Sequence, residues 1–230
     1  MRDDALRELM DDPACDPERL RSTLRRFDTV NRLVAGWDAV YRTHVRPTLA
    51  GLGRPARVLD LGSGGGDVIA RLAAWAHRDG LDASWLGADP DTRAHAVATS
   101  RGAPATVSFL CTDAATLRAE GAVFDIVISN HVLHHLDDHL HGFLDDSAAL
   151  SRGPVLHSDI ERGRLAYTLY ALGITPLAPG TFLRTDGLRS IRRSYTVPEL
   201  REQLETRASG SWRVERPTTF RLLAVGTGHA

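Results

Sequence analysis

The sequence predicts an α/β protein built on a doubly wound, mainly parallel sheet. Three observations lead to this fold class. Short apolar stretches alternate with amphipathic helical stretches over residues 57–158, a glycine-rich turn follows the first of them, and two further apolar stretches form a hairpin near the C-terminus. Alternation of strands and helices at this pitch favours parallel strands with helices on both faces of the sheet.

The individual elements follow from apolar periodicity and from turn residues. Residues 160–193 interrupt the alternation with a helical stretch and an arginine-rich segment, and we expect them to form a helical cover. Thr196 and Glu199 are spaced as a capping box that opens a further helix. The expected strands are 57–61, 84–89, 106–111, 124–129, 154–158 and the hairpin 212–215 with 220–226, and the expected helices before the cover are 18–46, 67–78, 91–99 and 137–150.

We expect one domain over residues 1–230, because this length suits a single α/β unit. Its expected parts are an N-terminal helical segment (1–54), a ligand-binding core (55–159), the cover (160–193) and a C-terminal helix with the hairpin (194–230).

Composition restricts the possible functions. The net charge is −1, which does not favour a nucleic-acid partner, and no apolar run is long enough to cross a membrane. All 28 basic residues are arginine, which excludes Schiff-base chemistry on lysine and a Walker-type phosphate loop. Two distant cysteines, Cys15 and Cys111, favour a reducing cytoplasm. We therefore expect a cytoplasmic monomer or homodimer, and its lysine-free, arginine-rich composition suggests a bacterial source.

The glycine-rich turn "LDLGSGGGD" distinguishes between ligands. A dinucleotide fingerprint starting at Gly62 needs a third glycine at position 67, where the chain has Asp67, and this disfavours a nicotinamide-dependent oxidoreductase. The alternative frame places Asp60 before Gly62, Gly64 and Gly66. A carboxylate at that position can accept hydrogen bonds from the cationic amino group of an amino-acid-like ligand.

Two more aspartates follow the next strands. Asp89 ends the second strand, where a carboxylate can accept both hydroxyls of a ribose, and Asp113 follows the third, where it can accept from an adenine amine. Each aspartate alone is equally well explained as a helix cap. Together with Asp60, they describe a site for S-adenosylmethionine.

At this point the chain resembles the class I S-adenosylmethionine-dependent methyltransferases, from about residue 55 to the C-terminus. The resemblance rests on "VLDLGSGGGD", "GADP", "CTDA" and "FDIVISNHVLHHL". It implies a seven-stranded Rossmann-like sheet with the last strand antiparallel, and S-adenosylmethionine as the cofactor. The cofactor contacts that it implies are Asp60, Gly62, Ser63, Gly64, Gly66, Asp89, Pro90, Asp113, Ala114, Asn130 and His131.

The same resemblance directs the functional hypothesis to a small-molecule acceptor. The N-terminal helices and the segment 160–193 resemble the small-molecule branch, and "DGLRSIRRSYTVPEL" resembles methyltransferases of bacterial quinone and polyketide pathways. We expect methyl transfer to an oxygen, or an electron-rich carbon, of a phenolic, polyketide or quinone-like molecule of secondary metabolism. The alternative is a cofactor-binding protein of the same fold that does not methylate, such as a cyclase, a decarboxylase or a regulator.

Two further sequence features concern the acceptor. Residues 129–132 read Ser-Asn-His-Val where nitrogen methyltransferases typically carry an Asn/Asp-Pro-Pro-aromatic motif, and this disfavours a planar nitrogen as the acceptor atom. Four arginines of the cover are suited to a carboxylate or phosphate of the substrate, although a solvated loop explains them equally well. They are Arg184, Arg189, Arg192 and Arg193.

Five of the ten histidines lie within residues 129–142. We place His139 and His141 on the polar side of a helix, outside the site. For the others, three alternatives remain: a structural wall of the pocket, a general base at His134 or at His157, or a metal site.

The metal alternative comes from His131-x-x-His134-His135, which has the spacing of the Glu-x-x-Glu-His motif for divalent cations in small-RNA 2′-O-methyltransferases and ubiquinone-pathway O-methyltransferases. Imidazole ligands there would favour zinc, nickel or iron over magnesium. We keep His134 and His157 as catalytic candidates and expect no metal.

Overall fold

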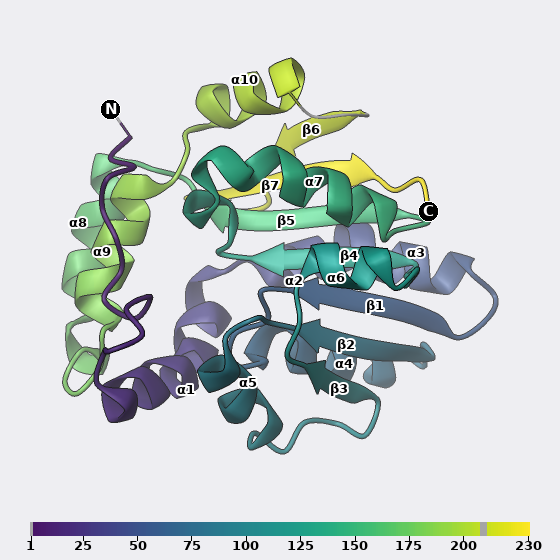
Figure 1. The fold of residues 1–230 in the computed structure, drawn as a ribbon, viewed down its shortest axis with the longest axis horizontal. Coiled ribbons are helices and arrows are strands. Elements are labelled where there is room, and N and C mark those ends of the chain that lie inside the picture. Colours follow the sequence, from purple (N-terminus) through teal and green to yellow (C-terminus); the bar gives the residue numbers. More distant parts are fainter. Residues whose placement is uncertain (1, 208–210) are drawn as a thin grey trace.

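The computed structural model describes residues 2–207 and 211–230, and its centre is a seven-stranded sheet in the order β3-β2-β1-β4-β5-β7-β6 (Figure 1). Strands β1 to β5 are parallel, whereas β7 runs antiparallel to both β5 and β6. This confirms the predicted fold class. The strands are β1 (Ala56–Leu61), β2 (Ala83–Ala88), β3 (Val107–Leu110), β4 (Ile126–Asn130), β5 (Pro154–Ile160), β6 (Trp212–Glu215) and β7 (Arg221–Thr227).

Helices cover both faces of the sheet. Alternate strand residues point to opposite faces, so Val58 and Ile126 belong to one buried cluster and Leu59 and Val127 to another. The first cluster lies against α4, and the second against α6 and α7. The helices are α1 (Pro17–Val34), α2 (Trp37–Val40), α3 (Arg46–Gly51), α4 (Asp67–Arg78), α5 (Thr92–Thr99), α6 (Ala114–Ala119), α7 (Leu140–Ala149), α8 (Arg164–Gly173), α9 (Leu183–Arg193) and α10 (Val197–Arg207). No helix in the described ranges is long and apolar enough to span a bilayer.

The predicted helix over 18–46 is wrong in one respect: it is interrupted after Val34. Gly36 has a φ of 69°, a left-handed conformation that ends α1, and the chain then continues through α2 and a π-helical turn to α3. A Cβ atom at Gly36 would lie 2.5 Å from Oγ1 of Thr218, so the glycine also lets the β6–β7 loop approach. Apolar periodicity continues across the break and therefore could not reveal it.

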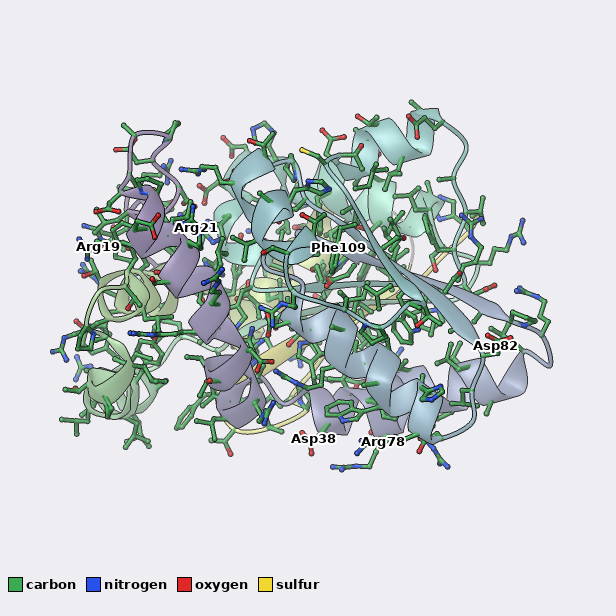
Figure 2. All side chains as sticks on the ribbon, turned by 90° about the horizontal axis from the view of Figure 1, so that it is seen from below. Arg19, Arg21, Asp38, Arg78, Asp82 and Phe109 are labelled. Atoms are coloured by element: carbon green, nitrogen blue, oxygen red, sulfur yellow. The ribbon has the colours of Figure 1, made fainter. Side chains whose placement is uncertain are left out.

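The cover consists of α8, α9 and the connection between them. Figure 1 shows it beside the carboxyl ends of the parallel strands, which point toward it. Arg19 of α1 fastens the cover by donating to the carbonyl of Thr181 and by lying 4.4 Å over the ring of Phe182. Figure 2 labels this arginine on α1, next to the cover helices. At the start of α10, Glu199 accepts from the backbone N–H of Thr196, which is one of the two hydrogen bonds of the predicted capping box.

Residues 2–15, which precede the predicted helix, run alongside α9 as an N-terminal strap (Figure 1). The amide of Asp3 donates to the carbonyl of Arg192, and Asp186 accepts from the amides of Leu9 and Met10. The strap therefore completes the cover from the other end of the sequence.

Candidate active site

A cavity of about 1350 Å³ lies between the carboxyl ends of the strands and the cover. Its wall is formed by the glycine loop (residues 62–66), the ends of β1, β2 and β4, the helices α1, α8 and α9, and the N-terminal strap. Pockets for one small ligand usually measure about 300–1,000 Å³. This cavity is therefore large enough for two ligands side by side.

The glycine loop adopts a conformation that other residues would not tolerate well. Gly62, Gly64 and Gly66 have φ values of 68°, 54° and 74°. A Cβ atom at Gly66 would lie 2.5 Å from the ring of Phe109, which Figure 2 labels, and one at Gly62 would lie 2.7 Å from Val132. A Cβ atom at Gly64 would meet only Leu24, at 4.0 Å. The side chains of Phe109 and Val132 therefore pack against the loop, which is open toward the cavity at Gly64.

Asp60 is a buried carboxylate that the fold does not neutralise. Its Oδ1 atom has no hydrogen-bond partner among the described residues, although its side chain lines the cavity. Burial raises the pKa of Asp60 well above its usual value, and the charges of Asp67 and Asp89 raise it further. Because an unpaired buried carboxylate is costly, the position fits a ligand that carries a cationic donor. The ammonium group of S-adenosylmethionine is such a donor.

Asp89 shapes the loop and also faces the cavity. Its Oδ2 atom accepts from the amide of Gly64 at 2.8 Å, and its Oδ1 accepts from the amide of Asp91 at 2.9 Å. Burial raises its pKa, while these two hydrogen bonds oppose the rise. Asp113 is the N-cap of α6, accepting from the amide of Thr116 at 2.8 Å, as the alternative explanation stated. It lines the same cavity, as do Ser63, Pro90 and Ala114.

Asn130 and His131 are held by Arg221, a buried arginine of β7 that the sequence did not single out. Arg221 donates to Oδ1 of Asn130 at 2.9 Å and to Nε2 of His131 at 2.7 Å. Burial and the Arg221 charge lower the pKa of His131 well below its usual value. The Nε2 lone pair of His131 is therefore occupied, which argues against the metal arrangement that begins at His131.

His157 is not where a general base must be. Its ring lies between Phe143 and Trp212, with centroids 4.9 and 5.7 Å away, and its Nδ1 atom is 2.8 Å from Oγ of Ser129. It is absent from the described lining of the cavity. Burial lowers its pKa to about 3. His157 lies in the predicted strand, but its side chain points to the α7 face of the sheet, so the structure does not support a catalytic role for it.

His134, the other catalytic candidate, lines the cavity and lies between two carboxylates. Its Nδ1 is 2.8 Å from Oδ1 of Asp159, and its Nε2 is 3.3 Å from Oε1 of Glu8. Burial disfavours the imidazolium, but Asp159 and then Glu8 outweigh it and raise the pKa of His134 to about 9. Glu8 belongs to the N-terminal strap. No motif marked it, so sequence reasoning missed it.

The remaining candidates divide between surface and cavity. Arg184 and Arg189 donate to backbone carbonyls, and Arg192 pairs with Asp3, so these three fasten the cover. Arg193 is buried at the cavity wall, 3.3 Å from Asp137. His139, which we expected outside the site, contributes to the cavity rim.

Comparison with known proteins agrees with this geometry. Residues 58–152 match a family model described as "Methyltransferase domain". This segment contains the glycine loop, Asp89, Asp113 and His134. A search of curated proteins finds no match to the chain.

Solved structures share the whole fold at low identity. The plantazolicin methyltransferase BpumL in complex with SAH superposes with a TM-score of 0.61 at 13% identity, over 93% of this chain and 95% of that one. The magnesium protoporphyrin IX methyltransferase ChlM from Synechocystis PCC 6803 with bound SAH gives a TM-score of 0.53 at 19% identity, over 84% of each chain. The CMeT domain of the citrinin polyketide synthase gives 0.52 at 17%, over 76% of this chain and 47% of that one. The fold is therefore the Rossmann-like methyltransferase fold.

Proposed function

We propose that the protein is an S-adenosylmethionine-dependent methyltransferase acting on an oxygen, or an electron-rich carbon, of a small molecule. The observation that carries the proposal is the unpartnered Oδ1 of Asp60, buried beside the glycine loop at the cavity wall. The match of residues 58–152 to a methyltransferase domain supports the same conclusion.

The residues present fit the cofactor in each of its parts. Asp60 would accept from the ammonium group, the open side of the loop at Gly64 would allow close approach, and Asp89 would accept from the ribose hydroxyls. Asp113 and Ala114 line the same cavity and would contact the adenine. When bound, the cofactor supplies a methyl group already activated on a sulfonium, so the task left to the protein is mainly to position the acceptor.

The acceptor side of the cavity is suited to a bulky apolar molecule. Its wall includes Phe27 and Val30 of α1, and Leu169, Ile174 and Leu177 of the cover region. Such a wall excludes water from the acceptor and holds it by apolar contact. Polymeric nucleic acid fits this largely apolar space poorly, and the net charge of −1 offers it no attraction.

General-base catalysis at His134 needs a change in its surroundings. With Asp159 and Glu8 beside it and a pKa of about 9, the ring holds its proton at neutral pH. We therefore expect His134, Asp159 and Glu8 to contribute mainly by positioning the acceptor and excluding water from it.

A transfer assay with methyl-labelled S-adenosylmethionine tests the proposal. The purified protein is incubated with phenolic, quinol and polyketide acceptors, and the label is followed into an organic extract. Titration calorimetry with S-adenosylmethionine and S-adenosylhomocysteine is run in parallel. Binding of both with no transfer to any acceptor would favour the non-methylating alternative, and failure to bind either would refute the cofactor assignment.

A further inference from the structure

Three side chains from two distant parts of the sequence converge on the cavity wall. Oε1 of Glu8 is 3.3 Å from Nε2 of His134 and 3.6 Å from Nε2 of His135. One possible ligand atom from each of the three residues lies within 4.8 Å of the other two. In a tetrahedral site with metal–ligand distances of about 2.0–2.2 Å, ligand atoms are roughly 3.3–3.6 Å apart. The two distances to Glu8 match the edges of such a tetrahedron.

The outer side of each ring is held by a carboxylate. Nδ1 of His134 is 2.8 Å from Asp159, and Nδ1 of His135 is 3.4 Å from Asp11. A neutral ring that donates through Nδ1 presents a lone pair at Nε2. Two Nε2 lone pairs and a carboxylate oxygen would then face one another, and this arrangement requires positive charge between them.

Protons or a metal ion can supply that charge. A proton on His134 would place an imidazolium between Asp159 and Glu8, with the ring centroid of His135 only 4.2 Å away. One divalent cation supplies the charge while both rings stay neutral. A carboxylate behind a histidine, as Asp159 is behind His134, is the usual support of a metal-binding imidazole.

Glu8 is also held in a fixed position. Glu8 is buried, and it accepts a hydrogen bond from the hydroxyl of Ser190 on α9. The next two residues of the strap donate their amides to Asp186. Glu8 is thus held in place by the cover itself.

We propose that Glu8, His134 and His135 bind one divalent transition-metal ion of the zinc type. All three residues line the cavity, so a fourth coordination position faces it. Two imidazoles and one carboxylate with an open position are the ligand pattern of accessible zinc sites, and imidazole nitrogen disfavours magnesium. This ligand set replaces the one considered from the sequence, because His131 is bound to Arg221 and His157 lies in the core.

The open position has a consequence that rests on the proposed function. A hydroxyl or carbonyl oxygen of the acceptor is the class of ligand that would occupy it, and coordination would lower the pKa of a hydroxyl there.

Metal content and metal affinity test the site without an activity assay. The folded protein is freed of metal with a chelator, dialysed and titrated with Zn²⁺ by calorimetry, and then with Co²⁺ by visible absorption. We expect one ion per chain, a tetrahedral cobalt spectrum and a higher Tm with zinc, whereas Mg²⁺ should have no effect. Zinc bound well below one per chain, without a shift in Tm, would overturn the proposal.

Matched variants assign the ligands. His135→Ala and Glu8→Gln should each weaken zinc binding at least about 100-fold, more than is usual for loss of an outer-shell partner. His139→Ala is the control, because this exposed histidine lies on the same rim outside the cluster. Equal affinity of all three variants would place the metal elsewhere. S-adenosylmethionine binding is measured on the parent and on each variant. A parent that binds S-adenosylmethionine but no zinc overturns only the metal site, and a parent that binds zinc but no S-adenosylmethionine overturns only the cofactor assignment.

Discussion

Asp60 and Asp89 lie at the ends of neighbouring parallel strands, yet their carboxylates are used differently. Asp89 accepts from the amides of Gly64 and Asp91, whereas Oδ1 of Asp60 has no partner within the described chain. One carboxylate therefore shapes the glycine loop and the other remains for a ligand. The two residues give separate predictions.

Asp60→Asn should stabilise the ligand-free protein at neutral pH. The pKa of Asp60 is raised by burial, so its ionisation costs folding free energy once the pH exceeds the unfolded value of about 4. The parent should therefore become less stable as pH rises from about 4, whereas the variant should not. Thermal melts should give the variant a higher Tm at pH 7 and nearly the same Tm at pH 4.

The control is Asp82→Asn, a change at an exposed aspartate on the molecular periphery (Figure 2). It should leave Tm unchanged at both pH values. A parent as stable as Asp60→Asn at pH 7 would mean that Asp60 is compensated in the free protein.

Asp89→Ala should weaken S-adenosylmethionine binding by ten-fold or more. Each hydrogen bond from a ribose hydroxyl to the carboxylate is worth roughly 1.5–3 kcal/mol, and about 1.4 kcal/mol is a factor of ten. Asp89→Asn keeps the shape but can turn a donor toward the sugar, so it should fall between. Calorimetry on the folded variants measures this, with Asp82→Ala as control. Unchanged affinity in Asp89→Ala would place the ribose elsewhere.

Gly66→Ala should destabilise the protein more than Gly64→Ala. Both glycines have positive φ, so alanine costs roughly 1–2 kcal/mol at either position. At Gly66 the new methyl group would also meet the Phe109 ring at 2.5 Å, and overpacking adds roughly 1–3 kcal/mol. Urea unfolding at pH 7 compares the two free energies. Equal losses would show that the ring of Phe109 moves aside freely.

His157 should make the protein sensitive to mild acid. Its pKa falls from 6.5 to about 3 on folding, so the unfolded chain binds the proton first and stability is lost as pH falls below 6.5. Between pH 7 and pH 5 this amounts to about 2 kcal/mol. His157→Asn, which can still hydrogen-bond Ser129, should lose about that much less over the same interval.

The same variant tests whether His157 acts as a general base. Methyl transfer by His157→Asn should stay within a fewfold of the parent, whereas removal of a general base typically costs about 10²–10⁴. A loss of that size with unchanged Tm would restore the catalytic role.

The glycine loop and its aspartates were predictable because they occupy consecutive strand ends, where the order of the chain also fixes positions in space. The direction of His157 was not, since its face depends on the pleat and on the strands on either side. Arg221 lies in a hairpin strand with no motif around it. Glu8 could not be found at all, because an irregular segment brings it to the site only through contacts with α9.

The contacts of the N-terminal strap can form only late in folding. Its residues leave the ribosome before α9, but the hydrogen bond from Leu9 to Asp186 spans 177 positions, and that from Arg2 to the carbonyl of Arg193 spans 191. No local folding event can form these contacts, and closing so long a loop becomes favourable only when the partner surface is already ordered. The wall that holds Glu8 is therefore completed after the sheet and α9. Amide hydrogen exchange should see the strap open as a separate unit while the strands remain protected.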